Sequence, residues 1–392
     1  MTYTNAEKMI KNAPLTDLAD DLGQILNRLG NPEKRVGIIK IYGTSGKSSV
    51  CTLLSSVLSA AGYKVGRLTT PFVHSIPDSI CIYEKPIPID CFTKSADEVY
   101  KAVCDIKKSR EDGKVFAPSN HSLLFATAFS AFADAGCDYA LIEIPNDNVS
   151  HTVFNSPIIS VICSTDSEES AKSICTRLDR NSKEIVSALQ CREVYKIVSD
   201  KCAEINVRLT LPLKNSFLHM RSSIKRTEFT YNGRVYLNGC GAYYQTDNML
   251  TVIEATEALR RCGIKIAGTD ICSAVLYEGI PLRFEIISIM PTIIVDRANT
   301  KERRKALIES LKKLEIHVPT TPTVICDEDR TGISDEFIAA DYPAEVFEIS
   351  IKEMKKHLRE ILPKLDEEST LIILGSSEYC EATTKLIREI LM

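Results

Sequence analysis

The clearest chemical signal in the sequence is the glycine-containing loop at residues 43–49, which reads GTSGKSS. A glycine turn that leads into a helix gathers backbone N–H groups into an anion pocket, and Lys47 would add a positive charge at the terminal phosphates of a nucleotide. The loop is two residues shorter than the common phosphate loop G-x-x-x-x-G-K-[ST], so its context must support it. We predict that the whole loop contacts a nucleotide: Gly43, Thr44, Ser45, Gly46, Lys47, Ser48 and Ser49.

Two acidic residues lie at the ends of apolar runs that are typical of buried strands. Glu143 is near the end of the run 139–144, and Asp296 follows the run 292–295. In a parallel sheet, such positions project toward the crevice that holds ligands. Nucleotide-bound Mg²⁺ needs only one or two carboxylates beside phosphate oxygens and waters. Glu143 is therefore predicted to be a magnesium ligand and Asp296 follows the same logic, while the alternative for each is a solvated acid at a strand end.

A phosphate loop requires a strand before it and a helix after it, and the sequence provides both. Residues 36–42 form a short run rich in β-branched side chains, and the apolar residues of the segment 50–61 recur at helical spacing until Gly62. This context favours a phosphate loop over an ordinary turn that carries a surface lysine. An earlier helical pattern, 18–29, ends at Gly30 before the strand.

Strand and helix patterns alternate along the rest of the chain, which predicts an α/β fold with parallel sheets covered on both faces. A pattern with an Asn232-Gly233 turn adds a hairpin at 226–238. Further strands are expected at 139–144, 158–163, 292–295, 323–326, 346–349 and 371–374, and further helices at 123–135, 250–261, 301–314 and 351–362.

The length of 392 residues is too great for one ordinary core. A boundary near Pro291 would give a nucleotide-binding domain at 1–290 and a smaller, Rossmann-like α/β domain at 291–392.

Composition narrows the classes of protein that the chain can represent. It has 48 Lys and Arg against 52 Asp and Glu, so no overall positive field is available for nucleic acid or an anionic membrane. The 14 cysteines contain no C-x-x-C pair and fit buried thiols in a reducing compartment. No signal peptide or membrane-spanning run is evident, so we expect a cytoplasmic protein. Glycine is scarce, with 17 residues or about 4%.

The loop and its flanking segments resemble the folylpolyglutamate and dihydrofolate synthases, which belong with the Mur ligases. The lead-in LGNP at 29–32 and the loop itself are similar to the L-G-N-P and G-T-N-G-K-G-S of that family. The segment GYKVGRLTTP at 62–71 resembles its G-Y-K-V-G-L-F-T-S-P, whose serine is a magnesium ligand. Thr70 stands in the place of that serine, so the resemblance implies that Thr70 and Glu143 hold Mg²⁺.

Later motifs extend the resemblance to nearly the whole chain. YQTDN at 244–248 is similar to H-Q-x-x-N, PLRFE at 281–285 to P-G-R-F-E, and DRAN at 296–299 to D-G-A-H-N. These matches imply that Asn248, Arg283 and Asp296 contact the nucleotide. Lys183 falls where the family has a carbamylated lysine.

The sequence also departs from the family at specific places. After Glu143 it reads IPNDN where the family has the glycine-rich V-G-L-G-G-R, and the histidine that binds a second metal corresponds to Ser167. The S-P-H of the pterin loop becomes Thr70-Pro71-Phe72. Part of the glycine shortage lies in these places, because Ser48, residues 144–148, Leu282 and Arg297 occupy positions where the family uses glycine.

The resemblance implies an ATP-dependent amide ligase that adds an amino acid, glutamate, to a folate-like carboxylate through an acyl phosphate. ATP and Mg²⁺ would be its cofactors, small molecules its partners, and Lys47, Lys183 and Arg283 its catalytic residues. The altered segments leave two alternatives open: a ligase of the same fold with a non-folate acceptor, or a nucleotide-binding regulator or partner subunit without catalysis. The sequence leaves the oligomeric state open.

Overall fold

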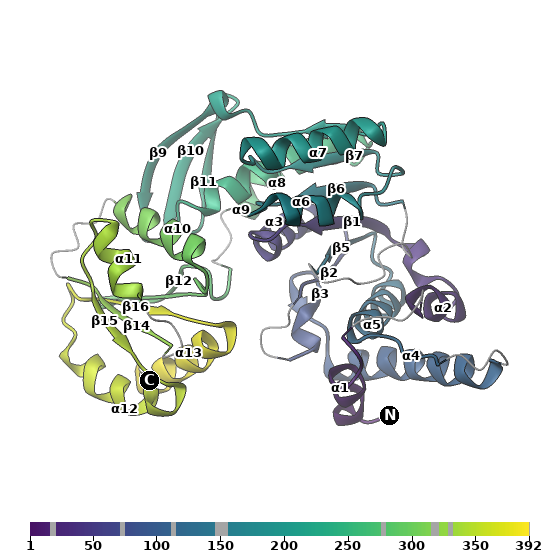
Figure 1. Ribbon diagram of the computed structural model, residues 1–392, viewed down its shortest axis with the longest axis horizontal. Coiled ribbons are helices and arrows are strands. Elements are labelled where there is room, and N and C mark those ends of the chain that lie inside the picture. The colour runs from purple at the N-terminus through teal and green to yellow at the C-terminus, as the bar shows by residue number, and fades with distance from the viewer. Residues whose placement is uncertain are drawn as a thin grey trace. The chain divides into compact units, whose positions relative to one another are not determined.

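The computed structural model describes residues 1–15, 21–70, 75–110, 115–145, 156–275, 280–314, 321–327 and 332–391 (Figure 1). The chain divides into two compact units. Unit 1 comprises residues 1–212 and 248–274, and unit 2 comprises 213–247 and 275–392. The expected boundary near Pro291 differs from this division because residues 213–247 pack with the C-terminal part of the chain. Cys240 and Ala242, for example, belong to the same hydrophobic core as Leu307.

Unit 1 is built on a mainly parallel sheet. As far as the structure describes it, the strand order is β4-β3-β2-β5-β1-β6-β7-β8, with β3 and β4 antiparallel to their neighbours. The strands are β1 (Gly37–Tyr42), β2 (Val65–Leu68), β3 (Ile80–Ile82), β4 (Lys85–Pro86), β5 (Tyr139–Glu143), β6 (Ile159–Ile162), β7 (Glu184–Ser187) and β8 (Arg208–Thr210).

Helices cover both faces of this sheet, as the alternating pattern predicts. Ile38 and Tyr42 of β1 face a core that also contains Phe125 and Ile174, whereas helix α3 packs against β1, β2 and β5. The helices are α1 (Tyr3–Lys11), α2 (Asp21–Arg28), α3 (Lys47–Ala60), α4 (Ile89–Ser109), α5 (Asn120–Ala135), α6 (Glu168–Cys175), α7 (Arg192–Glu204), α8 (Gln245–Arg261) and α9 (Gly268–Val275). The unit boundary falls within α8, between Asp247 and Asn248.

Unit 2 contains two sheets. An antiparallel sheet has the order β11-β10-β9, and the turn Asn232-Gly233 between β10 and β11 has φ values of 48° and 73°, as the hairpin motif predicts. The second sheet has the order β12-β13-β16-β14-β15 and is parallel except for β12. The elements are β9 (Phe217–Ser223), β10 (Arg226–Tyr231), β11 (Arg234–Asn238), β12 (Glu285–Ile289), β13 (Thr292–Asp296), β14 (Thr323–Cys326), β15 (Glu345–Glu348), β16 (Thr370–Leu374), α10 (Lys301–Lys312), α11 (Ile333–Ala339), α12 (Ile351–Ile361) and α13 (Ser377–Leu391).

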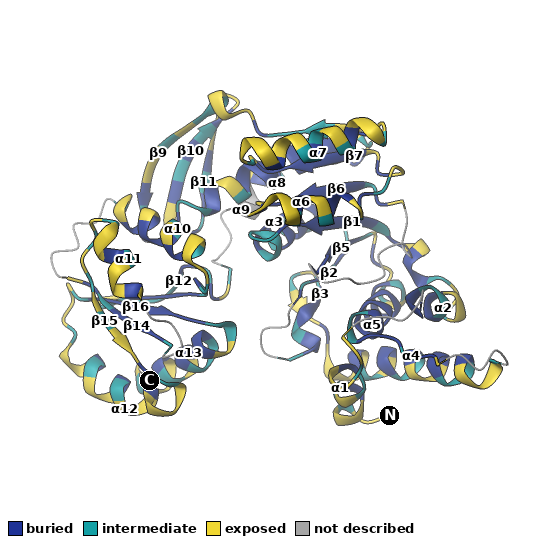
Figure 2. Cartoon of the chain, in the orientation of Figure 1, coloured by how far each residue is buried: buried dark blue, intermediate teal, exposed yellow. Residues whose placement is uncertain are grey.

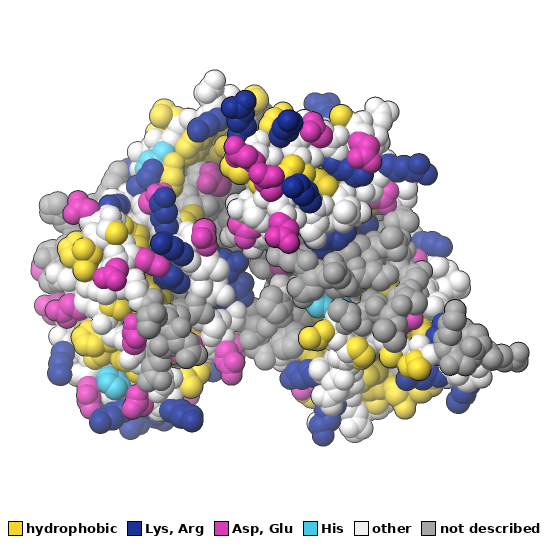
Figure 3. Space-filling model, viewed as in Figure 1, with side chains coloured by type: hydrophobic (Ala, Val, Ile, Leu, Met, Phe, Trp, Pro, Cys, Tyr) yellow, Lys and Arg dark blue, Asp and Glu magenta, His cyan; other side chains and the backbone are white. Residues whose placement is uncertain are grey.

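Burial follows these layers. The central strands β1, β5, β6 and β16 are almost wholly buried, whereas helices such as α7 and α12 expose one side to solvent (Figure 2). Basic and acidic side chains are interspersed on the face seen in Figure 3. Within the part of the chain that the structure describes, no helix combines the length and the apolar character needed to cross a membrane.

Candidate functional site

The glycine loop lies between β1 and α3, at the carboxyl end of the parallel strands. Gly46 is the N-cap of α3 with a φ of 83°, and Gly43 has a φ of 132°. A Cβ atom on Gly43 would lie 2.8 Å from the Cβ of Cys163, and one on Gly46 would lie 2.4 Å from the Oδ1 of Asn248. Both positions therefore require glycine, and the side chain of Asn248 lies against Gly46.

Two backbone amides of the loop already form hydrogen bonds within the protein. Those of Thr44 and Ser45 donate to the carbonyl oxygen of Ser164 at 2.9 and 3.1 Å, and the Thr44 hydroxyl donates to the same oxygen at 3.2 Å. These groups brace the loop against the segment after β6. The anion pocket that the geometry supports is therefore the first turn of α3, which begins at Lys47, because the first amides of a helix point beyond its end.

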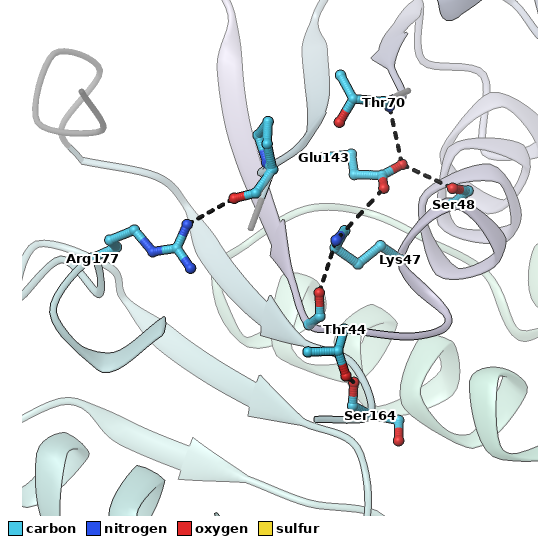
Figure 4. A network of polar contacts seen from close by, with 9 residues as sticks. Thr44, Lys47, Ser48, Thr70, Glu143, Ser164 and Arg177 are labelled. Atoms are coloured by element: carbon cyan, nitrogen blue, oxygen red, sulfur yellow. Dashed lines mark hydrogen bonds and ion pairs between the residues drawn. The ribbon is translucent and has the colours of Figure 1, made fainter. Parts of the chain in front are cut away.

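Glu143 forms the centre of a polar network beside this turn (Figure 4). It is the last residue of β5 and only 2% exposed. Its Oε2 accepts hydrogen bonds from the Ser48 hydroxyl at 2.9 Å and from the Thr70 amide at 3.3 Å. Its Oε1 lies 4.0 Å from the Nζ of Lys47, which donates to the Gly43 carbonyl at 2.8 Å. The structure thus brings together Lys47, Ser48, Thr70 and Glu143 from separate sequence motifs.

Asp296 and Arg283 lie in a second cluster, in unit 2. The Oδ2 of Asp296 accepts from the Tyr244 hydroxyl at 2.6 Å and from the Phe284 amide at 2.9 Å. Burial raises the pKa of Asp296, and the nearby Arg283 opposes that rise. Leu282 and Phe284 flank Arg283 with φ values of 58° and 53°, so the turn that presents Arg283 is strained on both sides.

Lys183 does not join the loop. It precedes β7, and its amide donates to the carbonyl of Ile158, which precedes β6. The first residues of β6 and β7 pair at this edge, whereas the loop follows the carboxyl end of β1. Lys183 therefore lies at the opposite edge of the sheet from the loop. Strand direction, which motif spacing does not reveal, decides the edge at which Lys183 lies, and its predicted catalytic role stays a prediction.

Arg177 is a basic residue near the loop edge that the sequence motifs did not indicate. It follows α6, and its Nη1 donates to the carbonyl of Pro145 at 2.7 Å, two residues beyond Glu143 (Figure 4). Its own carbonyl accepts from the Tyr42 hydroxyl at 3.0 Å, and Tyr42 is the last residue of β1. The sequence could have indicated Arg177 by its position, because it lies in the same connection between α6 and β7 as Lys183.

The segments that depart from the family can be located only in part. Pro71, Phe72 and residues 146–148 lie outside the described residues. Ser167, in the place of the second-metal histidine, is the N-cap of α6, where its side chain accepts from the Ser170 amide. Among the described residues, no three or more His, Cys, Asp and Glu side chains gather as a metal cluster.

No protein-family model matches the chain. It is 24% identical over 362 residues to the folylpolyglutamate synthase of Lacticaseibacillus casei, covering 87% of this chain and 84% of that protein. It is 36% identical over 121 residues to the dihydrofolate synthetase of Saccharomyces cerevisiae, covering 31% of this chain and 26% of that protein. The high local identity and the longer, weaker match point to the same group of proteins.

Solved structures match the fold over the full length. The folylpolyglutamate synthetase from Lactobacillus casei superposes with a TM-score of 0.83 at 21% identity and covers 100% of both chains. The Mycobacterium tuberculosis folylpolyglutamate synthase complexed with ADP matches with a TM-score of 0.81 at 18% identity and 98% coverage of both.

The fold and the site together define a two-unit α/β protein with a short phosphate loop. More narrowly, the chain is similar to the folylpolyglutamate and dihydrofolate synthases over most of its length.

Proposed function

We propose that the protein is an ATP-dependent ligase that joins the amino group of glutamate to a carboxylate of a folate-like molecule. The observation that carries this proposal is the assembly of Lys47, Ser48 and Glu143 at the first turn of α3. Two kinds of likeness support it: the curated relatives are folylpolyglutamate and dihydrofolate synthases, and one solved neighbour is a complex of folylpolyglutamate synthase with AMPPCP and folate.

The reaction would proceed in two transfers. The acceptor carboxylate attacks the γ-phosphorus of ATP, which releases ADP and forms an acyl phosphate. The amino group then attacks the acyl carbon, loses a proton and expels inorganic phosphate, which leaves an amide. The protein contributes mainly position and charge. Lys47 would exchange its bond to the Gly43 carbonyl for a phosphate oxygen, and the amides of the first turn of α3 would hold the phosphates.

The residues beside the loop fit Mg²⁺. A buried carboxylate on Glu143 and the hydroxyl of Thr70 are the oxygen donors that this ion prefers, and phosphate oxygens and water would complete its shell. When bound with ATP, the ion offsets negative charge on the phosphoryl group. The amide of Thr70 and the hydroxyl of Ser48 orient the Glu143 carboxylate.

We assign the remaining residues by what they contact. Asn248 lies over Gly46 and would fix the shape of the loop. For Arg283 we keep the role that its motif implies, a contact to the nucleotide, and Asp296 would hold the turn that presents Arg283. Lys183 has no part in this proposal because it lies at the other edge of the sheet.

The acceptor is the part of the proposal that differs most from the relatives. The chain continues from Glu143 into Ile144 and Pro145, where the family begins its glycine-rich V-G-L-G-G-R, and Arg177 contacts the Pro145 carbonyl. This rebuilt edge favours, as the second candidate function, a ligase of the same fold that acts on a non-folate acceptor.

We also propose a cytoplasmic location, supported by the absence of a disulfide among the described cysteines.

The decisive experiment incubates purified protein with Mg-ATP, glutamate and a panel of folates and other carboxylates, and measures phosphate release and product mass. A folate product with one added glutamate is expected. Lys47→Ala should abolish turnover, whereas Lys172→Ala, which changes an exposed lysine on α6, should not. Product formed only with a non-folate acceptor would favour the second candidate. No turnover with any acceptor, together with ATP binding that needs Lys47, would favour a nucleotide-binding regulator.

A further inference from the structure

Ser48 combines features of two kinds of phosphate loop. In the resembling family, the residue after the loop lysine is glycine, whereas this chain has a serine there. In the longer and commoner loop G-x-x-x-x-G-K-[ST], the residue after the lysine is a serine or threonine whose hydroxyl contacts Mg²⁺. Ser48 therefore places on the short loop a hydroxyl that the longer loop uses as a metal ligand.

The geometry around Ser48 matches that role. Its Oγ lies 2.9 Å from the Oε2 of Glu143. Mg²⁺ binds oxygens at about 2.0–2.1 Å in a near-ideal octahedron, so neighbouring ligand oxygens are about 2.9 Å apart. The two oxygens already have the separation of adjacent ligands. They also come from rigid elements, since Glu143 ends β5 and Ser48 lies in the first turn of α3.

The charge arrangement supports the same assignment. Lys47 precedes Ser48, and its Nζ lies on the Oε1 side of the carboxylate, 4.0 Å away. The Ser48 hydroxyl and the Thr70 amide lie on the Oε2 side. The lysine and the hydroxyl thus approach the carboxylate at different oxygens.

We propose that Ser48 is a direct ligand of the Mg²⁺ that accompanies ATP, adjacent to Glu143 in its coordination shell. The assignment rests on the proposed function, because it requires ATP binding at this loop. It would give the ion one more protein contact in a chain whose second-metal histidine is replaced by the α6 cap Ser167. The rival role for Ser48 is to orient Glu143 without touching the ion.

The test measures ATP affinity by titration calorimetry in EDTA, in Mg²⁺ and in Cd²⁺. Ser48→Ala should lose about tenfold of the tightening that Mg²⁺ gives, and its affinity in EDTA should stay within about threefold of wild type. Ser48→Thr should keep the tightening. Ser48→Cys should bind weakly in Mg²⁺ and regain wild-type affinity in Cd²⁺, because a soft thiolate ligand prefers the softer ion.

Ser56→Cys is the matched control. Ser56 lies on the same helix, with its Oγ bonded to the Thr52 carbonyl, and its thiol should produce no switch between the two ions. Undiminished Mg²⁺ tightening in Ser48→Ala would overturn the proposal. So would weak binding by Ser48→Cys in both ions, which would indicate the orienting role. Wild-type protein that binds no ATP under any condition would remove the proposed function itself.

Discussion

Glu143 and Asp296 are alike in position and in their immediate donors, yet they lie in different chemical settings. Each is the last residue of a strand in a parallel part of its sheet, and each is 2% exposed. Each carboxylate accepts a hydrogen bond from a hydroxyl and another from a backbone amide. The hydroxyl at Glu143 comes from Ser48, beside a lysine and the first turn of a helix. The hydroxyl at Asp296 comes from the bulky side chain of Tyr244.

The difference shows that an acid at a strand end is not by itself a ligand site. A small serine on a helix terminus leaves the carboxylate beside groups that we propose to bind phosphate and a cation. A tyrosine and the Phe284 amide instead make the carboxylate a structural acceptor that fixes the turn at Arg283. Variants of Glu143 should therefore affect ligand binding most, and variants of Asp296 should affect folding most.

The largest effect is expected for Asp296→Ala. The Tyr244 hydroxyl and the Phe284 amide would both lose their acceptor in a buried site, so the free energy of unfolding should fall by about 4 kcal/mol. Urea denaturation measures this change. Glu360→Ala, on the exposed side of α12, is the control and should change it by less than about 0.5 kcal/mol. A loss below about 1 kcal/mol at Asp296 would contradict the structural role.

Lys40 extends the comparison to a buried cation. It lies within β1 at 1% exposure, and burial lowers its pKa to about 8 while Asp179 opposes the change. Between this pKa and the ordinary value near 10.5, the unfolded chain binds more protons than the folded one, so stability rises with pH. Wild type should gain up to about 3 kcal/mol relative to Lys40→Met from pH 8 to 10.5. Parallel stability curves for the two proteins would disprove this.

Glu143→Gln should separate metal-dependent from metal-independent binding. Removing the charge should weaken Mg-ATP by about 30-fold, because Mg²⁺ prefers a carboxylate, and should change ATP affinity in EDTA by less than about threefold. Calorimetry in the two buffers measures both values, with Glu168→Gln on the exposed first turn of α6 as control. Equal weakening in the two buffers would remove Glu143 from the metal site.

The smallest effect is expected for Tyr244→Phe. It removes one of the two hydrogen bonds to Asp296 and keeps the ring, so unfolding should cost about 1.5 kcal/mol less. Urea denaturation should show this loss, while ATP affinity in EDTA stays unchanged. If ATP affinity falls and stability does not, the Asp296 cluster contacts the nucleotide directly, as the motif DRAN first implied.

Local patterns predicted most of the elements around the loop. The strand before it, the helix after it and the strand that carries Glu143 are found as β1, α3 and β5. The expected strands of the C-terminal sheet are β13, β14, β15 and β16. Helix α4, which spans Ile89–Ser109, was not predicted. The prediction of the Asn232-Gly233 turn is confirmed, because the positive φ values of such a turn depend on those two residues alone.

Partners distant in sequence could not be predicted in the same way. The sequence does not reveal that the carbonyl oxygen of Ser164 accepts hydrogen bonds from the backbone amides of Thr44 and Ser45. Nor does motif spacing reveal that Arg177, and not Lys183, reaches the loop edge, because that depends on strand direction.

The sequence by itself determined the α/β alternation, the glycine loop with its lysine, and the acids at two strand ends, because these depend on side-chain periodicity and on backbone freedom over a few residues. Only the tertiary structure decided what each acid meets. Ser48 lies 95 positions from Glu143 in the chain, and Tyr244 lies 52 from Asp296. The packing of elements brings these pairs together, and it distinguishes the carboxylate that we propose to bind a cation from the one that accepts hydrogen bonds within a turn.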